Sequence, residues 1–331
     1  MFDIITIGDL VVDTHVKIDD AKVTSDFKKN RRLCLSFADK IPITESFQSL
    51  GGNAGNVAVA SVKLGEKTAV VSTVGMDSNS VLIKQELKKQ GVVTDYLVMD
   101  SMTATRYSIV LTHLGERTIL SYHKKRNYTF PQKLPLTKCL YYTSLSEGFK
   151  PLQKKLFAYL VKHPDTLLAF NPGSYQIKNA VIEVKQAIKK TDLLIVNLEE
   201  AMRILWPNKK DIGVRENVAG VMNGLWKLGA KEVVLTDGEN GAYAGNKKEV
   251  WQMKIYPEKV VSKTGAGDAF SAGFIAGKIK GYDIPTCLMW GAANSAGVVR
   301  LVGAQNGLLS ESGIKKMIVK YKNIKPKRVK K

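Results

Sequence analysis

The sequence has few of the residues that build disulfide-bonded or zinc-binding domains. Its 331 residues include only three cysteines and four histidines. The scattered cysteines form neither a disulfide framework nor, with no histidine at ligand spacing, a zinc site. No apolar run approaches the roughly 20 residues that span a bilayer, and the first residues lack the basic region of a signal peptide. We therefore expect a cytoplasmic protein with no membrane partner.

Acidic residues are also scarce, because 30 Asp and Glu stand against 50 Lys and Arg, a formal net charge of +20. Nine cations and no acid lie between Ile314 and Lys331, and a second basic run covers residues 28–32. Such runs are typical of solvated surfaces, and they also bind phosphate backbones. We expect a solvated basic helix or tail over 314–331, and a nucleic-acid-binding or regulatory protein stays as the alternative from another class.

The rest of the chain alternates short apolar runs with helical patterns. Strands are expected where β-branched or aromatic runs end at turn formers, at 4–7, 69–74, 139–142, 167–170, 193–196 and 233–235. Amphipathic patterns predict helices at 53–64, 80–90, 152–161, 179–189 and 214–228. This alternation predicts an α/β fold with a mainly parallel central sheet covered on both faces.

Two segments depart from the alternation. Residues 14–45 are polar and basic, and residues 105–123 predict two strands joined by a turn whose Gly115 suits a positive φ. Inserted strands of this kind form either a lid over a site or an extension of the sheet edge, and both remain open. With no internal repeat and no linker, we expect one domain over 1–331 with small lid segments.

A small-residue loop, Gly265-Ala266-Gly267, leads directly into an apolar helical run that begins at Asp268. Glycines allow close approach of the backbone to a ligand, and the first amides of a helix lack intrahelical partners. Those amides and the helix dipole favour a phosphate group. Asp268 is placed either to accept a proton from an attacking hydroxyl or to cap the helix. The loop is no Walker A motif, since its lysine, Lys263, precedes the glycines.

Two stretches resemble the signatures of the ribokinase-like (PfkB) family of sugar and nucleoside kinases: GGNAGNVA at 51–58 and TGAGDAF at 264–270. They occur in the family order, and the likeness extends from Gly8 to Gln305. The resemblance implies a three-layer αβα sandwich with a small β lid. It also implies an ATP-dependent, Mg²⁺-requiring kinase that phosphorylates a hydroxymethyl group of a sugar or ribonucleoside.

The same resemblance implies catalytic roles in the second signature. Asp268 matches the general base of the family, and the amides of Gly265, Ala266 and Gly267 match its anion hole. Phosphoryl transfer has a loose transition state, so positioning and charge stabilisation are the main requirements.

Acceptor-binding residues follow from the first signature and the first strand. Asp13 matches the acid that binds sugar hydroxyls, and Gly52, Asn53 and Asn56 match the diglycine loop that closes over the sugar. Asn53 also fits a helix N-cap, and we expect both roles.

On the ATP side, Asn197 and Glu200 match the N-x-x-E motif that faces the phosphates and magnesium. Mg²⁺ tends to keep its waters, so Glu200 is expected to act through water. By spacing alone, the pair equally fits a helix cap with its capping-box partner.

The loop with Thr236, Gly238 and Gly241 resembles the family loop around the ATP phosphates and also fits a tight turn into a hairpin. Asn294 is a candidate for the adenine pocket, with packing or capping as the alternative.

Departures from the family pattern concern cation binding, acceptor and assembly. Ser262 stands where the family commonly has an acid near its monovalent-cation site, which argues against potassium activation. Lys124 and Arg126 replace neutral residues after the lid hairpin, and they either bind a phosphorylated acceptor, as in the phosphofructokinase-like branch, or are surface charge. The apolar segment 109–111 permits the lid-mediated homodimer that is common in the family.

Overall fold

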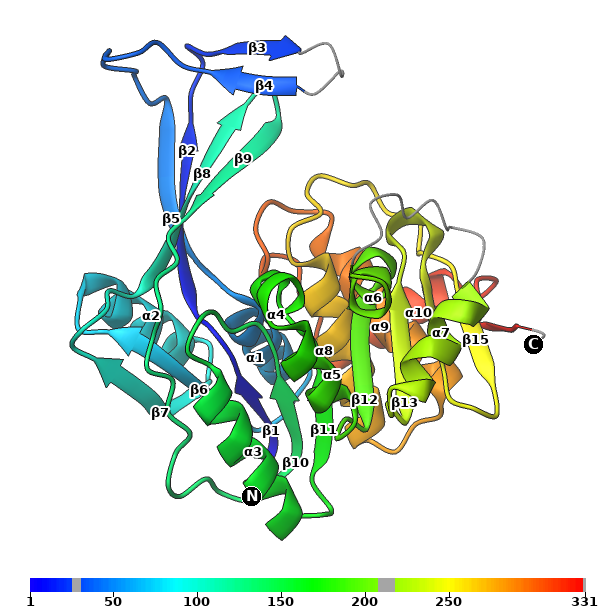
Figure 1. The fold of residues 1–331 in the computed structure, drawn as a ribbon. Coiled ribbons are helices and arrows are strands. Elements are labelled where there is room, and N and C mark those ends of the chain that lie inside the picture. Colours follow the sequence, from blue (N-terminus) through cyan, green and yellow to red (C-terminus); the bar gives the residue numbers. More distant parts are fainter. Residues whose placement is uncertain (26–30, 208–217, 330–331) are drawn as a thin grey trace.

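The computed structural model describes residues 1–25, 31–207 and 218–329 (Figure 1). Three parts of the sequence predictions lie outside the described residues: positions 28–30 of the basic run, 214–217 of an expected helix, and the last two lysines, 330 and 331.

A ten-stranded sheet crosses the middle of the molecule. In spatial order its strands are β16 (Lys327–Arg328), β15 (Val250–Met253), β14 (Ala242–Gly245), β13 (Glu232–Thr236), β12 (Leu193–Asn197), β11 (Leu167–Phe170), β10 (Thr137–Tyr142), β1 (Phe2–Ile7), β6 (Thr68–Gly75) and β7 (Val93–Asp100). The strands from β13 to β7 pair in parallel, and β14, β15 and β16 add in antiparallel fashion. The expected strands are all present, and the sheet is mainly parallel as predicted.

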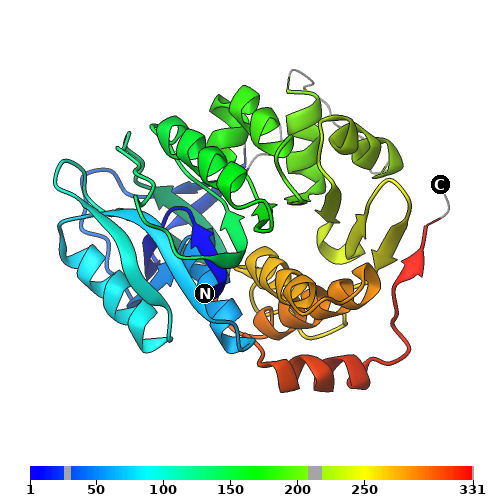
Figure 2. The same cartoon turned by 90° about the horizontal axis from the view of Figure 1, so that it is seen from below.

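Helices cover both faces of this sheet (Figure 2). One face carries α3 (Lys150–Lys162), α4 (Ser174–Asn179), α5 (Val181–Ile188), α6 (Leu198–Leu205) and α7 (Val218–Lys227). The other carries α1 (Asn53–Lys63), α2 (Ser78–Lys89), α8 (Ala266–Ile279), α9 (Ile284–Val298) and α10 (Glu311–Lys320). Successive side chains of a strand point to opposite faces of the sheet, so each strand contributes to both hydrophobic cores. In β12, Leu194 and Val196 pack on the first face, and Leu193 and Ile195 pack on the second. The three-layer αβα sandwich is thereby confirmed.

A second, four-stranded sheet stands out from this body (Figure 1). Its order is β5 (Glu45–Gly51), β2 (Val11–Lys17), β8 (Arg106–His113) and β9 (Glu116–Ser121), and a separate hairpin of β3 (Lys22–Ser25) and β4 (Arg31–Cys34) lies at its outer end. The first lid segment was expected at 14–45. It is longer in the structure, because β2 begins at Val11 and β5 ends at Gly51, and the two strands pair along their whole length. The pair expected within 105–123 is β8 and β9.

One expected helix differs in detail. The helix expected at 179–189 is α5, which begins at Val181 because the backbone of Ala180 (φ −146°, ψ 42°) is not helical; Asn179 instead ends α4, a short helix that was not predicted. The described part of the basic tail is the helix α10 followed by the edge strand β16, and its lysines and Arg328 are exposed, as expected for a solvated basic helix. Only the apolar side of α10 is buried, through Ile314 and Met317. None of the described helices has the length and apolar character needed to cross a membrane.

Candidate active site

Asp268 lies in the first turn of α8. The preceding residue, Gly267, lines one cavity with Asn197 and Thr236, the last residues of the parallel strands β12 and β13. The N-cap of α8 is Gly265, in the left-handed region at φ 77°, so the interpretation of Asp268 as an N-cap is wrong. A Cβ on Gly265 would lie 2.5 Å from Cα of Ala304. The glycine is therefore required both by its backbone conformation and by the close approach of the 303–305 segment.

The main-chain amides of the glycine loop differ in availability. The Ala266 amide donates to the Lys263 carbonyl at 3.3 Å, which closes a turn before the helix. The amides of Gly265 and Gly267 have no acceptor within the described part of the chain. The anion hole expected from three amides thus has two free donors, together with the positive end of a 14-residue helix.

The carboxylate of Asp268 is held by the diglycine helix. Nδ2 of Asn56, in α1, donates to Oδ2 of Asp268 at 2.8 Å. Oδ1 of Asn56 accepts from Nε2 of Gln305 at 3.1 Å, which orients the amide. Burial raises the pKa of Asp268 to about 6, and the hydrogen bond from Asn56 opposes this shift. The result is a carboxylate that can take up a proton close to neutral pH.

Asp13 lies in β2, on the four-stranded sheet, with a half-buried side chain. Burial raises its pKa, and a hydrogen bond with Ser108 and the charge of His15 lower it. The carboxylate lies directly against the diglycine: a Cβ on Gly51 would be 2.2 Å from Oδ2 of Asp13. Gly52 is the N-cap of α1 at φ 87°, and a Cβ there would meet the Asp9 carbonyl at 2.5 Å. The two glycines therefore allow α1 to begin beside the two aspartates.

Asn53 is the first residue of α1 and not its cap, so the expected capping role is wrong. Its Nδ2 donates to Oδ1 of Asn171 at 3.2 Å, and Nδ2 of Asn171 donates to the Ile195 carbonyl at 2.7 Å. Asn171 directly follows β11 and was not predicted as a site residue. Its position after the end of a parallel strand is the signal that could have identified it.

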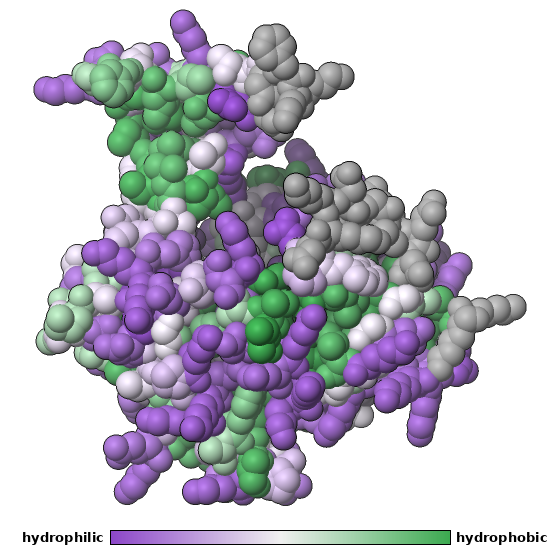
Figure 3. Space-filling model, in the orientation of Figure 1, coloured by the Kyte–Doolittle hydropathy of each residue, from purple (hydrophilic) through white to green (hydrophobic). Residues whose placement is uncertain are grey.

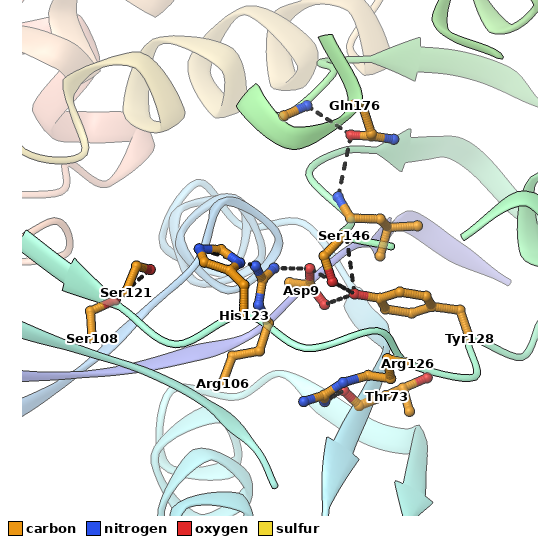
Figure 4. A network of polar contacts seen from close by, with 12 residues as sticks. Asp9, Thr73, Arg106, Ser108, Ser121, His123, Arg126, Tyr128, Ser146 and Gln176 are labelled. Carbon is orange, nitrogen blue, oxygen red and sulfur yellow. Dashed lines mark hydrogen bonds and ion pairs between the residues drawn. The ribbon is translucent and has the colours of Figure 1, made fainter. Parts of the chain in front are cut away.

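A buried polar network fixes the base of the four-stranded sheet (Figure 4). Arg106, the first residue of β8, forms an ion pair with Asp9, which follows β1. The Tyr128 hydroxyl donates to Oδ1 of Asp9 at 2.8 Å and contacts the Ser146 hydroxyl at 2.7 Å. His123 lies on the other side of Arg106, 3.3 Å from its Nη2. None of these residues was predicted, since a buried pair distant in sequence has no local pattern.

The structure corrects the interpretation of Arg126 as a ligand for a phosphorylated acceptor or as surface charge. Arg126 is 2% exposed. Its Nη1 and Nη2 donate to the carbonyls of Thr73 and Ala104, each at 2.5 Å. The guanidinium therefore ties the end of β6 to the segment before β8 (Figure 4). Lys124 is exposed.

Asn197 and Glu200 form the capping box of α6. Oδ1 of Asn197 accepts from the Glu200 amide at 2.8 Å, and Oε2 of Glu200 accepts from the Asn197 amide at 2.9 Å. Burial raises the pKa of Glu200 to about 6, the bond from Asn197 lowers it, and the charge of Asp268 raises it further. The capping interpretation is confirmed, and the charge of Glu200 interacts with that of Asp268.

A cavity of about 500 Å³ opens beside the glycine loop. Six of the predicted residues line it: Asn197, Thr236, Gly238, Gly241, Ala266 and Gly267. Its apolar wall includes Phe270 from α8 and Ala292, Ala296 and Val299 from α9 and the residue after it. The predicted ATP loops therefore meet the glycine loop at one cavity.

Asn294 does not line this cavity, which corrects its expected place in the adenine pocket. It is fully buried, with Nδ2 donating to the Ala269 carbonyl at 2.9 Å and Oδ1 accepting from the Leu309 amide at 3.0 Å. The side-chain amide of Asn294 therefore joins α8, α9 and the segment before α10. This is the packing role given as the alternative in the sequence analysis.

A sequence model described as pfkB family carbohydrate kinase matches residues 16–311 of this chain. The chain belongs to this family. Members are kinases of sugars and nucleosides, so the protein is a phosphotransferase that acts on a hydroxyl group. The residues that line the cavity, the glycine loop and Asp268 all lie within the matched range 16–311.

Named relatives differ in the acceptor that their names state. The chain is 24% identical over 327 residues to an ATP-dependent 6-phosphofructokinase of Thermoanaerobacterium thermosaccharolyticum, covering 96% of this chain and 94% of the relative. The fold matches a nucleoside kinase of Methanocaldococcus jannaschii (TM-score 0.75, 20% identity, 97% and 99% of the two chains). It also matches Arabidopsis thaliana ribokinase complexed with ribose and ATP (TM-score 0.77, 20% identity, 96% and 98%).

Proposed function

We propose that this enzyme transfers the γ-phosphoryl group of ATP to a hydroxymethyl group of an unphosphorylated sugar or ribonucleoside. One observation carries the proposal: the carboxylate of Asp268 stands beside the free amide of Gly267 and is held by Asn56 from the diglycine helix. A proton acceptor and an anion site thus lie within one helical turn.

In this mechanism the acceptor oxygen forms a bond to the γ-phosphorus while the bond from that phosphorus to the bridging oxygen of ADP breaks. Asp268 takes the proton of the acceptor hydroxyl as general base. The amides of Gly265 and Gly267 and the positive end of α8 stabilise the negative charge on the moving phosphoryl group.

The acceptor is proposed to bind between Asp13 and Asp268, in contact with the diglycine loop. A carboxylate accepts two hydrogen bonds from vicinal hydroxyls, and the Asn53 amide both donates and accepts. Because Arg126 is buried and its Nη1 and Nη2 donate to two carbonyls, the guanidinium is not placed to contact an acceptor phosphate. This favours an unphosphorylated acceptor over the phosphofructokinase-like alternative, which retains only Lys124.

ATP is proposed to occupy the 500 Å³ cavity. Phe270, Ala296 and Val299 offer an apolar wall for the adenine ring, and the loops at Thr236 and Gly238 are placed for the phosphates. In the described tail Lys315 and Lys320 form ion pairs with Glu311 and Glu258, so part of its positive charge is neutralised. Its other cations are exposed, and the nucleic-acid alternative is decided by the binding test below.

Magnesium is proposed to arrive with the nucleotide, because no group of three or more His, Cys, Asp or Glu side chains is placed to hold a metal in the described ranges. The residues present fit a hydrated divalent ion: Glu200 is half-buried, and its negative charge interacts unfavourably with that of Asp268. Glu200 would hold the ion through water, with Asn197 beside it. When bound, the ion neutralises phosphate charge.

We further propose that the four-stranded sheet is a lid of a single domain and that it mediates a homodimer. Its strands carry exposed apolar side chains, and its surface is largely apolar in Figure 3. Tyr107 and Leu120 share one face, since Ile109 pairs with Leu120 and lies two residues from Tyr107. Light scattering should give a dimer for the wild type and a monomer for Leu120→Asp, and a monomeric wild type would contradict the proposal.

The proposed function is tested by ADP release with Mg-ATP over free pentoses, hexoses, nucleosides and hexose phosphates, each with and without potassium. We expect release with an unphosphorylated acceptor, no dependence on potassium, and a product heavier by one phosphoryl group. Release only with hexose phosphates would support the phosphofructokinase-like alternative. No release with any acceptor, together with RNA or DNA affinity that falls steeply with salt and is lost on deleting residues 314–331, would support nucleic-acid binding.

A further inference from the structure

Arg117, near the start of β9, joins the outer end of the four-stranded sheet to the segment before the glycine loop. Its Nη1 donates to Oγ1 of Thr264 at 2.6 Å and to Oγ of Ser262 at 3.1 Å. Thr264 directly precedes Gly265, the N-cap of α8. The contact therefore reaches from the proposed lid to the residue next to the anion site.

The pairing of the strands places Arg117 on the same face as Asp13. Arg117 is opposite Thr112, and Thr112 is opposite Lys17. Directly opposed residues share a face, as do residues an even number apart along a strand, so Asp13 and Lys17 point the same way. At about 3.3 Å per residue, Asp13 and the row of Arg117 are roughly 13 Å apart along the sheet. One face thus carries the acceptor-binding acid and the contact to the glycine loop.

The segment that Arg117 holds is already folded on itself. Ser262 is 6% exposed, and its Oγ also accepts from the Thr264 amide at 3.3 Å. Both bonds leave one nitrogen, Nη1, whose two N–H groups lie in the plane of the guanidinium, so the directions of the two bonds are fixed. The three N–H groups of a lysine ammonium rotate and do not fix these directions. Because Gly265 packs against Ala304 and begins α8, the position of Thr264 decides where the following amides point.

The charge of Arg117 is also felt within the site. Burial lowers the pKa of His15, Asp13 opposes this shift, and Arg117 adds to it. His15 lies in β2, two residues after Asp13 and in the row between Asp13 and Lys17. This agrees with the strand pairing and with the bonds to Ser262 and Thr264, which place Arg117 on the face of the sheet that carries Asp13 and His15.

We infer that Arg117 is a positioning residue that couples closure of the four-stranded sheet over the acceptor to alignment of the glycine-loop amides. The inference rests on the proposed function. Acceptor binding at Asp13 favours the closed sheet, the closed sheet brings Arg117 to Ser262 and Thr264, and the fixed loop presents the Gly265 and Gly267 amides to the phosphoryl group. Without this contact the loop is less well aligned and the site is less well closed to water.

The structural half of this inference is tested without any substrate, by hydrogen exchange of the free protein. Arg117→Ala should speed amide exchange across residues 262–268 relative to the wild type. Lys17→Ala is the matched control. Lys17 lies in the same cross-strand row as Arg117, but its Nζ pairs with Glu45 at 2.8 Å, so its removal should leave the exchange of residues 262–268 unchanged. Equal exchange in Arg117→Ala and the wild type would overturn the inference, whether or not the protein proves to be a kinase.

The functional half is tested by kinetics. Arg117→Ala should lower kcat for acceptor phosphorylation roughly 10-fold or more, within the range for displaced catalytic groups, with little change in the KM for ATP. The ratio of ATP hydrolysis to acceptor phosphorylation should rise, Arg117→Lys should recover only part of kcat, and Lys17→Ala should match the wild type. The effects of Arg117→Ala and Thr264→Val should be non-additive. Full recovery in Arg117→Lys, additive effects, or an unchanged hydrolysis ratio would each overturn the inference.

Discussion

The side-chain amide of Asn56 donates a hydrogen bond of 2.8 Å to the carboxylate of Asp268, 212 residues later in the chain. This bond joins α1, which begins at the diglycine, to α8, which begins at the glycine loop. It also stabilises the charged form of a carboxylate that burial destabilises. The two signatures of the sequence are therefore two halves of one site.

The acid limb of the pH profile should report this carboxylate. A general base acts when deprotonated, and burial raises the pKa of Asp268 to about 6. Activity should therefore fall as the pH decreases through about 6, by roughly tenfold per pH unit well below the pKa. Glu200, with a pKa of about 6, interacts with Asp268, so the profile reports the pair.

Asn56→Ala should move that limb to higher pH, because it removes the hydrogen bond that lowers the pKa of Asp268. The measurement is kcat/KM against pH for both proteins under saturating magnesium. A limb that stays in place would show that Asp268 does not govern the profile.

Gly51→Ala should weaken acceptor binding and leave nucleotide binding intact. The added Cβ would lie 2.2 Å from Oδ2 of Asp13, so the carboxylate must move. We expect the KM of the acceptor to rise about tenfold, which corresponds to the loss of roughly 1.4 kcal/mol of binding, with the KM for ATP unchanged. Equal KM values for both substrates in variant and wild type would place the acceptor elsewhere.

Ala296→Leu should weaken nucleotide binding and leave acceptor binding intact, the reverse of the effect expected for Gly51→Ala. Its longer side chain would extend from the wall of the cavity into the proposed adenine site, raising the KM for ATP with little effect on the acceptor. Ala296→Gly is the control, since it removes volume and should still admit the nucleotide. Nucleotide affinity that is indifferent to the leucine would assign the cavity to another ligand.

Arg126→Gln should destabilise the fold without changing acceptor preference. Loss of the two bonds to the Thr73 and Ala104 carbonyls leaves buried acceptors unsatisfied, at about 1–3 kcal/mol each. We expect a lower Tm in thermal unfolding, and no change for the exposed control Lys124→Gln. An unchanged Tm with a raised KM for hexose phosphates alone would revive the phosphofructokinase-like alternative.

Patterns along the chain were enough for the central sheet, because its strands are short, apolar and alternate with helices. The glycine loop and the diglycine were recognisable for a physical reason: both require glycine, Gly265 and Gly52 at positive φ and Gly51 against Asp13. Gln305 contacts Asn56 from a distant segment, and no local pattern marks it as a neighbour of the site.

Buried polar side chains account for two of the predictions that were wrong. Arg126 and Asn294 are polar residues whose groups bind main-chain atoms inside the fold, and no spacing distinguishes them from residues that bind ligands. The contact of Arg117 with Thr264 was missed for a related reason, since it depends on how the four-stranded sheet lies over the body.

The account is tested most directly by the turnover of Asp268→Asn, measured by ADP release with a saturating acceptor. The substitution keeps the size of the side chain and removes the proton acceptor, so kcat should fall by at least ~10², while calorimetric ATP affinity and Tm show that the fold and the cavity are intact. A variant that binds ATP normally and turns over at near the wild-type rate would contradict the account.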